Sequence, residues 1–489
     1  MRRALALLLL GVTVLSSACA WNPATRRLDF NLLSDADEIE LGRRGDVEVV
    51  SAAGIYDDDP LEAMVTEVGA RLAAQSERPG LSWTFRTLDA PEVNAFALPG
   101  GFVYVTRGLL AHLEDEAELA AVLGHEIGHV TGRHGVTQYS RARVASRSVG
   151  FFRIFDPELR HVGAVAGVTA GLALLKHSRA DEEEADRLAL RYLARGGYPP
   201  AAMSDVLGLL VFLARAQGEA GLPILLSSHP DPGDRQALID RELARRGLAT
   251  SARRQDPDFL ARLDGLVIGD DPRLGLVIDG HTLVRASAGY ALDLPEGWKI
   301  ERDRTMAMAS DPGEKLLFIV GPASGDDLDA VERAFIDKPK VRARPRWNGR
   351  IPETEGGGGA FDLVSGDTWL SGIVVFADLG GTILVMMLAG EHAEFGAHGA
   401  SLEHHLSTLR RLDPATRASI TPDRLALARP AVPTRLDALA SDPDEVALVG
   451  RLNRRAPTEM IGPGTTVKVV RRGQRPAGAE PREAAGDPG

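Results

Sequence analysis

The chain of 489 residues contains a single cysteine, Cys19, and aromatic residues make up only 5% of it. One cysteine cannot form an internal disulfide, so we expect no structural disulfide in the fold. An excess of positive charge is also missing, because 68 acidic and 56 basic residues give a net charge of −12. No basic stripe with interleaved aromatic residues is present, so we expect no nucleic acid as a partner.

Long hydrophobic runs are scarce beyond the first 20 residues. The best later candidate, 162–175, has 14 residues and is rich in Gly and Ala. A membrane-spanning helix needs about 20 apolar residues. We therefore expect a buried or membrane-grazing helix at this position and an otherwise soluble protein.

The N-terminal stretch MRRALALLLLGVTVLSSACA has two arginines, an apolar run and small residues before a cysteine, as in a bacterial secretory signal. Two processing sites compete. Ala18 and Ala20 form an A-x-A cleavage site, whereas 16–19 resembles a lipobox with Ser in place of the usual Leu. We expect residues 1–20 to be a signal peptide. The mature protein would lie in the periplasm, anchored to the outer membrane by a lipidated Cys19 or soluble there.

The patterning predicts an α+β fold with several domains. Residues 21–262 favour a mainly helical domain, with helices at 61–75, 114–133, 179–195 and 201–217 and a small sheet from 81–88 and 101–106. Residues 263–413 carry strand patterns, including GIVVFA and TILVMML across a Gly-Gly turn, with helices at 326–335 and 401–409. These residues predict a second domain, an antiparallel α/β sandwich.

The order of the second domain, from ALDLPEGW to HHLSTLRRL, is similar to the PsbP-like sandwich family. No titratable cluster in it indicates chemistry, so we expect a binding or scaffold role. Residues 414–471 resemble a degenerate LysM module, with Val-Pro-Thr at 432–434 where Gly-Asp-Thr is usual, which would imply peptidoglycan contact. Residues 472–489 have the Gly, Pro and charge content of a disordered tail.

Three histidines and one glutamate lie in GHEIGHVTGRH, residues 124–134. On a helix, His125 and His129 share one face, so both imidazoles can bind one metal ion. Glu126 lies about 100° around the helix and can act on a water there without replacing a ligand. An apolar stripe supports a buried helix: Leu119, Val122, Leu123, Ile127 and Val130. The stretch therefore predicts an HExxH metal site.

The third histidine, His134, lies nine residues after His125, which is about 180° around a continuous helix. In metzincins a break at glycine brings a third histidine to the metal. Their HExxHxxGxxH spacing would place it at residue 135, which is Gly here. We therefore predict that His134 is a structural or surface residue and that His134→Ala keeps the metal.

A catalytic site with three protein ligands needs one more, and SRADEEEADRLAL at 178–190 offers carboxylates. Glu182 and Asp186 are four residues apart and share a helix face. Alone, such an acidic run is typical of a solvated helix start. Paired with HExxH, it predicts Glu182 as the third zinc ligand and Asp186 as the acceptor that orients a ligand histidine.

Together these motifs resemble the gluzincin zinc metallopeptidases, which include the CAAX prenyl endopeptidases, the HtpX-like proteases and the periplasmic BepA-like proteases. Two further stretches fit this pattern, NAFALPGGFVYVTRGLL at 94–110 and SSHPDPGDR at 227–235. The resemblance covers residues 35–245. The CAAX prenyl endopeptidases and the HtpX-like proteases have long transmembrane helices. Because this chain lacks long apolar helices, it resembles the soluble periplasmic branch more closely.

The resemblance implies further site residues. GFVYVT would be an edge strand beside the zinc, to which an extended peptide adds; a plain core strand is the alternative. His229 would stabilise the oxyanion or cap zinc as a fourth ligand, unless it only begins a helix. Substrate contacts would come from Asn94, Ala95, Phe96, Gly100 and Gly101.

The leading hypothesis is a Zn2+-dependent endopeptidase of the bacterial cell envelope. One catalytic zinc would be held by His125, His129 and Glu182, and Glu126 would move a proton from water to the leaving amine. Unfolded or misassembled envelope proteins would be the substrates. Two alternatives remain: a non-catalytic chaperone or adaptor with a peptidase fold, and a peptidoglycan amidase directed by the LysM-like segment.

Overall fold

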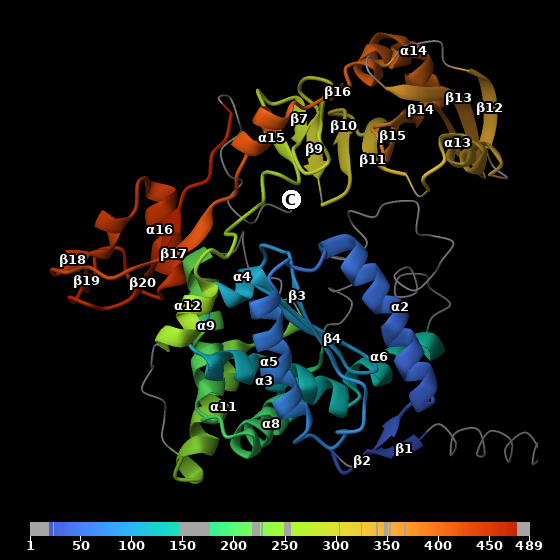
Figure 1. Cartoon of the computed structure of the whole chain (residues 1–489). Coiled ribbons are helices and arrows are strands. Elements are labelled where there is room, and N and C mark those ends of the chain that lie inside the picture. Colours follow the sequence, from blue (N-terminus) through green and yellow to red (C-terminus); the bar gives the residue numbers. More distant parts are fainter. Residues whose placement is uncertain are drawn as a thin grey trace, which may run out of the picture. The chain divides into compact units, whose positions relative to one another are not determined.

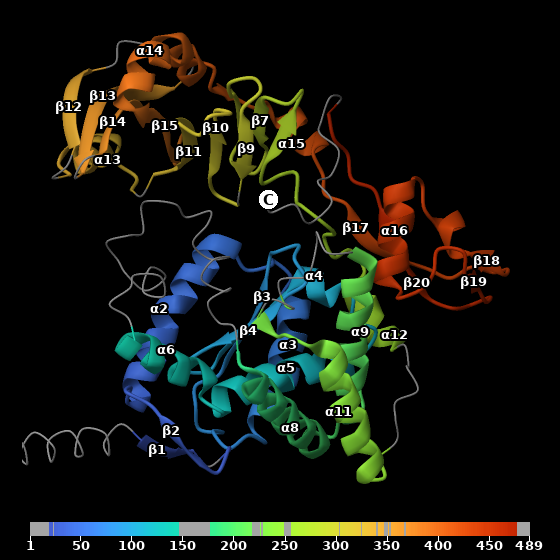
Figure 2. The same ribbon diagram turned by 180° about the vertical axis from the view of Figure 1, so that it is seen from behind.

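The computed structural model describes residues 19–22, 24–145, 177–217, 225, 228–248, 256–302, 304–323, 325–338, 341–346, 351, 354–365 and 368–476. They form two compact units, seen from opposite sides in Figure 1 and Figure 2. The first has its main segments at Met1–Gly269 and Arg424–Arg471, and the second at Asp270–Asp423 and Arg472–Arg482. Residues 1–18, the expected helix at 162–175 and 477–489 of the expected tail lie outside the described residues. Within the described ranges, no helix has the length and hydropathy needed to span a bilayer.

Helices surround a small sheet in the first unit, as expected for an α+β domain. Before the second unit begins, the described helices are α2 (Asp35–Ala53), α3 (Asp59–Ala73), α4 (Arg107–Leu110), α5 (Glu116–Thr131), α6 (His134–Ala145), α8 (Arg179–Gly196), α9 (Ala202–Gln217), α11 (Pro232–Arg245) and α12 (Pro257–Leu263). Side chains of Asp58, Asp115 and Ser178 cap the N-termini of α3, α5 and α8. These three helices and α9 confirm the four predicted helices to within two residues at each end.

The sheet of the first unit has the order β3-β5-β4, from β3 (Thr84–Leu88), β4 (Ala95–Leu98) and β5 (Phe102–Thr106). β5 pairs parallel with β3 and antiparallel with β4. GFVYVT therefore lies in the centre, and the expectation that it is the edge strand is wrong. Among the described strands, β4 is the edge on that side. A hairpin of β1 (Cys19–Asn22) and β2 (Arg27–Phe30) stands apart from this sheet.

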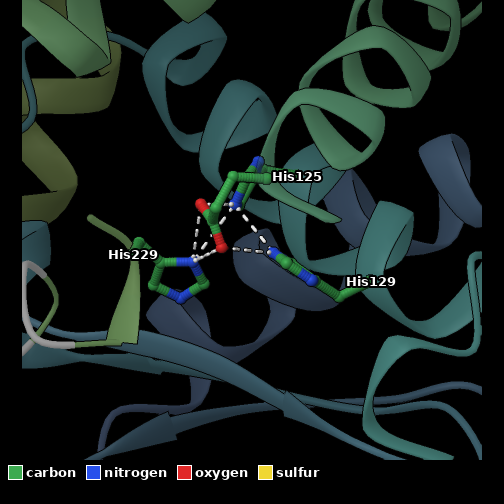
Figure 3. Close-up of side chains that lie close together, drawn as sticks. His125, His129 and His229 are labelled. Atoms are coloured by element: carbon green, nitrogen blue, oxygen red, sulfur yellow. Dashed lines mark hydrogen bonds and ion pairs between the residues drawn. The ribbon is translucent and has the colours of Figure 1, made fainter. Parts of the chain in front are cut away.

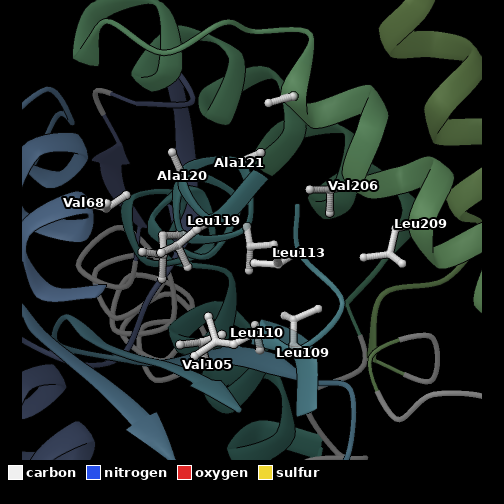
Figure 4. Close-up of a cluster of buried hydrophobic side chains, with 14 of the residues drawn as sticks. Val68, Val105, Leu109, Leu110, Leu113, Leu119, Ala120, Ala121, Val206 and Leu209 are labelled. Atoms are coloured by element: carbon white, nitrogen blue, oxygen red, sulfur yellow. The ribbon is translucent and has the colours of Figure 1, made fainter. Parts of the chain in front are cut away.

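A large hydrophobic core lies in the first unit, and a smaller cluster lies beside it, formed by Val49, Leu88, Phe96, Leu98 and Tyr104. Figure 4 shows side chains from α3, β5, α5 and α9 meeting in the large core, among them Val68, Val105, Leu119 and Val206. The same large core includes residues that follow the second unit in sequence: Leu425, Leu436, Val449, Leu452, Ile461, Val467 and Val470.

Residues 424–471 are thus part of the first unit, whereas the sequence predicts a separate module over 414–471. Their elements are β17 (Arg424–Ala428), β18 (Thr434–Arg435), the 3-10 helix η5 (Leu436–Leu439), α16 (Pro443–Leu452), β19 (Met460–Ile461) and β20 (Val467–Arg471). β17 pairs with β20, and β18 with β19. Nζ of Lys468, whose side chain is 1% exposed, donates to the carbonyl oxygen of Leu113 at 2.6 Å. Apolar and charged groups both anchor the segment.

The second unit contains an antiparallel sheet of order β12-β13-β14-β15-β11-β10-β9 and a smaller one of order β16-β8-β7-β6. Its strands are β6 (Leu276–Ile278), β7 (Thr282–Arg285), β8 (Tyr290–Asp293), β9 (Lys299–Arg302), β10 (Ala307–Ser310), β11 (Leu316–Pro322), β12 (Val341–Arg346), β13 (Glu355–Ser365), β14 (Thr368–Asp378), β15 (Ile383–Glu391) and β16 (Arg410–Arg411). Its helices are α13 (Leu328–Ile336), α14 (His392–Leu402), η4 (Glu403–Ser407) and α15 (Pro414–Ser419).

Pairing of β14 with β15 confirms the predicted hairpin. The predicted α-helix at 401–409 is wrong, since the α-helix ends at Leu402 and a 3-10 turn follows. Glycines at 396 and 399 lower the helix propensity of α14, so the sequence pattern did not predict a helix there.

Candidate metal centre

Helix α5 carries the HExxH motif in a buried setting. Asp115 caps its start by accepting a hydrogen bond from the backbone N–H of Glu118. His125, Glu126 and His129 are exposed by only 6%, 2% and 3%. Polar groups buried this deeply need partners, and a second helix supplies them.

Helix α8 brings two carboxylates to the motif. Ser178 caps its start, and the regular helix that follows places Glu182 and Asp186 one turn apart. α8 approaches α5 closely because Gly128 has no side chain, since a Cβ there would lie 2.9 Å from the carbonyl oxygen of Ala185. The glycine between the two histidines therefore lets the carboxylates reach them.

Nitrogen and oxygen atoms from α5, α8 and the segment before α11 converge on one point (Figure 3). Nε2 of His125 lies 3.0 Å from Nε2 of His129 and 3.5 Å from Oε2 of Glu182. Oε1 of Glu182 lies 3.4 Å from Nε2 of His129. Nδ1 of His229 lies 3.0 Å from Oε1 of Glu182 and 3.3 Å from Nε2 of His125.

These four donors fit one metal ion. In a tetrahedral site with bonds of about 2.0–2.1 Å, neighbouring donors lie about 3.3 Å apart, close to the five distances above. His125 and His129 each have a hydrogen-bonding partner at Nδ1, which leaves both Nε2 atoms directed at the same point, where they can bind one cation. Burial lowers the pKa of His129 well below its usual range, which keeps that ring neutral and able to bind a metal.

Asp186 and Arg235 support His125 from behind. Oδ1 of Asp186 lies 2.9 Å from Nδ1 of His125. Arg235, in α11, donates to both oxygens of Asp186 at 2.6 and 2.8 Å, and its Nη1 lies 2.5 Å from Oε2 of Glu182. Burial disfavours a charged His125, but hydrogen bonds with Asp186 and Glu182 outweigh burial and raise its pKa to about 9. The two carboxylates therefore attract positive charge to this point.

Glu126 lies beside the four donors but is not among them. Its Oε1 lies 3.6 Å from Nε2 of His229. Burial raises the pKa of the Glu126 carboxyl above its usual range. A raised pKa suits a group that both takes and returns a proton.

The structure places His134 differently from a continuous helix. Helix α5 ends at Thr131, and Arg133 takes a φ of 56°, so the chain turns before α6 begins. The turn brings Nδ1 of His134 to within 2.9 Å of Nδ1 of His129, and the residue is 5% exposed. The assumption of a continuous helix was wrong. His134 is a buried neighbour of His129, on the side away from the four donors.

The residues expected to contact a substrate lie at β4 and the turn after it. β4 packs against α5. Gly100 and Gly101 have φ values of 84° and 98°, and a Cβ on Gly100 would lie 2.7 Å from Cα of Ile39 in α2. Gly100 thus serves the tight packing of the turn against α2, whereas a Cβ on Gly101 would lie 2.9 Å from the side chain of Leu81. Three further residues are buried in this conformation: Asn94, Ala95 and Phe96.

Sequence reasoning missed two residues of the centre. Arg235 lies in the recognised stretch SSHPDPGDR, and a signal was present, because two buried carboxylates require a cation nearby. His177 stacks on the ring of His129 with centroids 3.9 Å apart. It precedes α8 and no regular spacing connects it with HExxH.

Comparison with known proteins identifies a peptidase domain. Residues 60–243 match peptidase family M48. The chain is 34% identical to the mitochondrial metalloendopeptidase OMA1 of Arabidopsis thaliana over 188 residues, 38% of this chain and 36% of that protein. It is 28% identical to the beta-barrel assembly-enhancing protease of Escherichia coli strain K12 over 214 residues, 42% of this chain and 43% of that protein. The match thus spans less than half the length of these relatives.

Among solved structures, the chain is similar to cyanobacterial PsbP from Synechocystis, with 11% identity and a TM-score of 0.21 over 26% of this chain and 88% of that one. A likeness at this score carries no argument about the fold. The PsbP-like and LysM-like interpretations therefore stay predictions. The motifs and the match over residues 60–243 agree, and this part of the first unit is a metallopeptidase domain of the peptidase family M48 type.

Proposed function

We propose that this protein is a zinc-dependent endopeptidase that hydrolyses peptide bonds in protein substrates. The observation that carries the proposal is the buried convergence of two imidazoles from an HExxH helix with a carboxylate from a second helix. Two histidines and a glutamate are one of the ligand sets used by catalytic zinc. His125, His129 and Glu182 would hold the ion.

The chemistry divides between the ion and Glu126. A zinc ion supplies Lewis-acid activation of water and of the scissile carbonyl. Glu126 takes the proton of the attacking water and returns it to the leaving amine. Because burial raises its pKa, the protonated form needed for the second transfer is accessible.

His229 acts in this proposal as a fourth ligand of the resting site. Its Nδ1 lies at ligand spacing from Glu182 and His125, at 3.0 and 3.3 Å. Catalytic zinc sites keep one position open, so His229 has to move away before a substrate binds. Because its ring lies next to Glu126 in the resting site, a small movement would leave it close enough to stabilise the oxyanion.

An extended peptide is the substrate that the sheet favours. β4 lies at the edge of its sheet and packs against the helix that carries His125 and His129. Pairing of main chains gives affinity with little preference for sequence, which suits unfolded or misassembled proteins. Substrate contacts would come from the strand and its turn, at Asn94, Ala95, Phe96, Gly100 and Gly101.

Envelope quality control is the setting we propose. The name of the Escherichia coli relative, a beta-barrel assembly-enhancing protease, supports it. The signal-like N-terminus adds a periplasmic location, with Cys19 as lipid anchor. Incorporation of labelled palmitate that is lost in Cys19→Ala would support the anchor, and equal labelling of both proteins would contradict it. Because residues 424–471 share the core of the first unit, protein substrates have more support than peptidoglycan.

The test is cleavage of casein by Glu126→Gln. We expect this variant to lose proteolysis while still binding one zinc per chain, because Glu126 moves protons and holds no metal. Glu183→Gln, an exposed position on α8, is the matched control and should cleave like the wild type. Undiminished cleavage by Glu126→Gln would contradict the mechanism. A wild-type protein that prevents aggregation of casein without cleaving it would favour the chaperone alternative.

A further inference from the structure

Both HExxH histidines use Nδ1 for a contact behind the metal centre. For His125 this contact is Asp186, at 2.9 Å. For His129 it is Nδ1 of His134, also at 2.9 Å. Nε2 of His134 in turn lies 3.3 Å from Oε2 of Glu184 in α8. Two hydrogen-bonded relays therefore back the centre, and one of them runs through a histidine.

Proton positions in the second relay follow from metal binding. A neutral histidine that binds a metal through Nε2 carries its proton on Nδ1. His129 therefore donates to Nδ1 of His134, which must be unprotonated there. The proton of His134 then lies on Nε2, where it faces the carboxylate of Glu184. This pattern fixes the tautomer of both rings.

The chain around His134 is shaped to admit its ring. A Cβ on Gly132 would lie 2.5 Å from Nε2 and 2.8 Å from Cε1 of His134, so only glycine leaves room. Arg133 takes the left-handed conformation that reverses the chain, and its Nη2 lies 3.4 Å from Oε2 of Glu38. The His134 side chain is 4% exposed and that of Glu184 is 16% exposed. A chance surface contact would not need this accommodation.

We propose that His134 is a positioning residue that orients the metal ligand His129, with Glu184 as its hydrogen-bond partner. The role rests on the proposed function, since it requires a metal at Nε2 of His129. Loss of an outer partner of this kind lowers metal affinity or activity about 10- to 100-fold, because the ligand ring loses its fixed orientation.

The test measures zinc affinity of the full chain by competition with a chromophoric chelator. His134→Ala should bind zinc about 10- to 100-fold more weakly than the wild type, and its cobalt(II) absorption spectrum should change as the ligand geometry relaxes. His134→Asn keeps an acceptor near the position of Nδ1 and should restore most of the affinity. Glu184→Ala should weaken binding, and Glu184→Gln should restore it. Glu183→Ala, the exposed neighbour, should bind like the wild type.

Wild-type affinity and an unchanged cobalt spectrum in His134→Ala would overturn the positioning role while leaving the proposed function intact. If that variant does not fold, the Glu184 pair decides, and equal affinity of Glu184→Ala and wild type overturns the relay. Two zinc ions per wild-type chain, falling to one in His134→Ala, would also overturn it by assigning His129, His134 and His177 to a second metal. A wild-type chain that binds no zinc would overturn the proposed function and this role together.

Discussion

Arg454→Met should weaken the attachment of residues 424–471 to the helix that carries the metal ligands. Nη1 and Nη2 of Arg454 lie 2.6 and 2.5 Å from the carboxylate of Glu118, and Nη2 donates to the carbonyl oxygen of His112 at 2.9 Å. The side chains of Arg454 and Glu118 are 6% and 2% exposed. Glu118 belongs to the first turn of α5, so this buried ion pair joins the two parts.

The expected loss of stability comes from the buried carboxylate of Glu118, which stays charged after its arginine partner is removed. Breaking a buried ion pair from one side costs about 3–5 kcal/mol. Glu118 still accepts a hydrogen bond from the N–H of Glu114 at 2.8 Å, so we expect the lower end of that range. With a loss of about 2–4 °C per kcal/mol, the unfolding midpoint should fall by about 6–12 °C. Methionine keeps a Cβ, so the φ of 51° at this position is equally strained in both proteins.

Thermal unfolding followed by circular dichroism measures the effect. Arg435→Met is the matched control, because its ion pair with Asp437 is more exposed, at 52% and 26%, and should contribute less than about 1 kcal/mol. The double variant Arg454→Met, Glu118→Gln should recover most of the loss, since it leaves no unpaired buried charge. A shift for Arg454→Met as small as that of the control would refute the reasoning.

Two further substitutions test how the centre is supported. Gly42→Ala should lower the free energy of unfolding by about 1–3 kcal/mol in chemical denaturation, because the added Cβ would lie 1.8 Å from the carbonyl oxygen of Pro99; an unchanged midpoint would contradict the close packing of α2. Arg235→Met should lower stability by about 3–5 kcal/mol in the same assay, because Asp186 loses its cation. Arg235→Lys should recover only part of that loss, since a lysine cannot bind both oxygens as a guanidinium does.

Local signals made the helices of the centre predictable. Helices α5 and α8 each have a capping residue at the N-terminus and a helical period of apolar residues. Both signals depend only on residues close together in the chain. Helix α2 was not predicted, because its buried positions include Glu38 and Asp46, and charged residues in a sequence are normally expected to be exposed to solvent. They are buried because Arg78 and Arg86, about 40 residues away, neutralise them. Ion pairs between residues so far apart in the chain produce no periodic pattern from which a buried helix could be predicted.

The metal centre shows the same difference between local relations, which the sequence predicts, and long-range ones, which it does not. Helical spacing brought His125 and His129 to one face and paired Glu182 with Asp186, because these relations depend only on the rise and turn of a helix. The assumption of a continuous helix up to His134 failed at one residue, since a left-handed Arg133 redirects the chain. Few non-glycine residues adopt that conformation, so a continuous helix was the simpler expectation.

Both ends of α5 are held by residues outside the family match. At its C-terminal end, Nδ2 of Asn22, which precedes residues 60–243, donates to the carbonyl oxygen of Thr131 at 3.1 Å. At its N-terminal end, Arg454 binds Glu118 from beyond that range. A metal site of the proposed kind needs ligands held in a narrow geometry by rigid elements. In this chain the matched segment therefore supplies the ligands, while flanking segments on either side of it hold the helix that presents them.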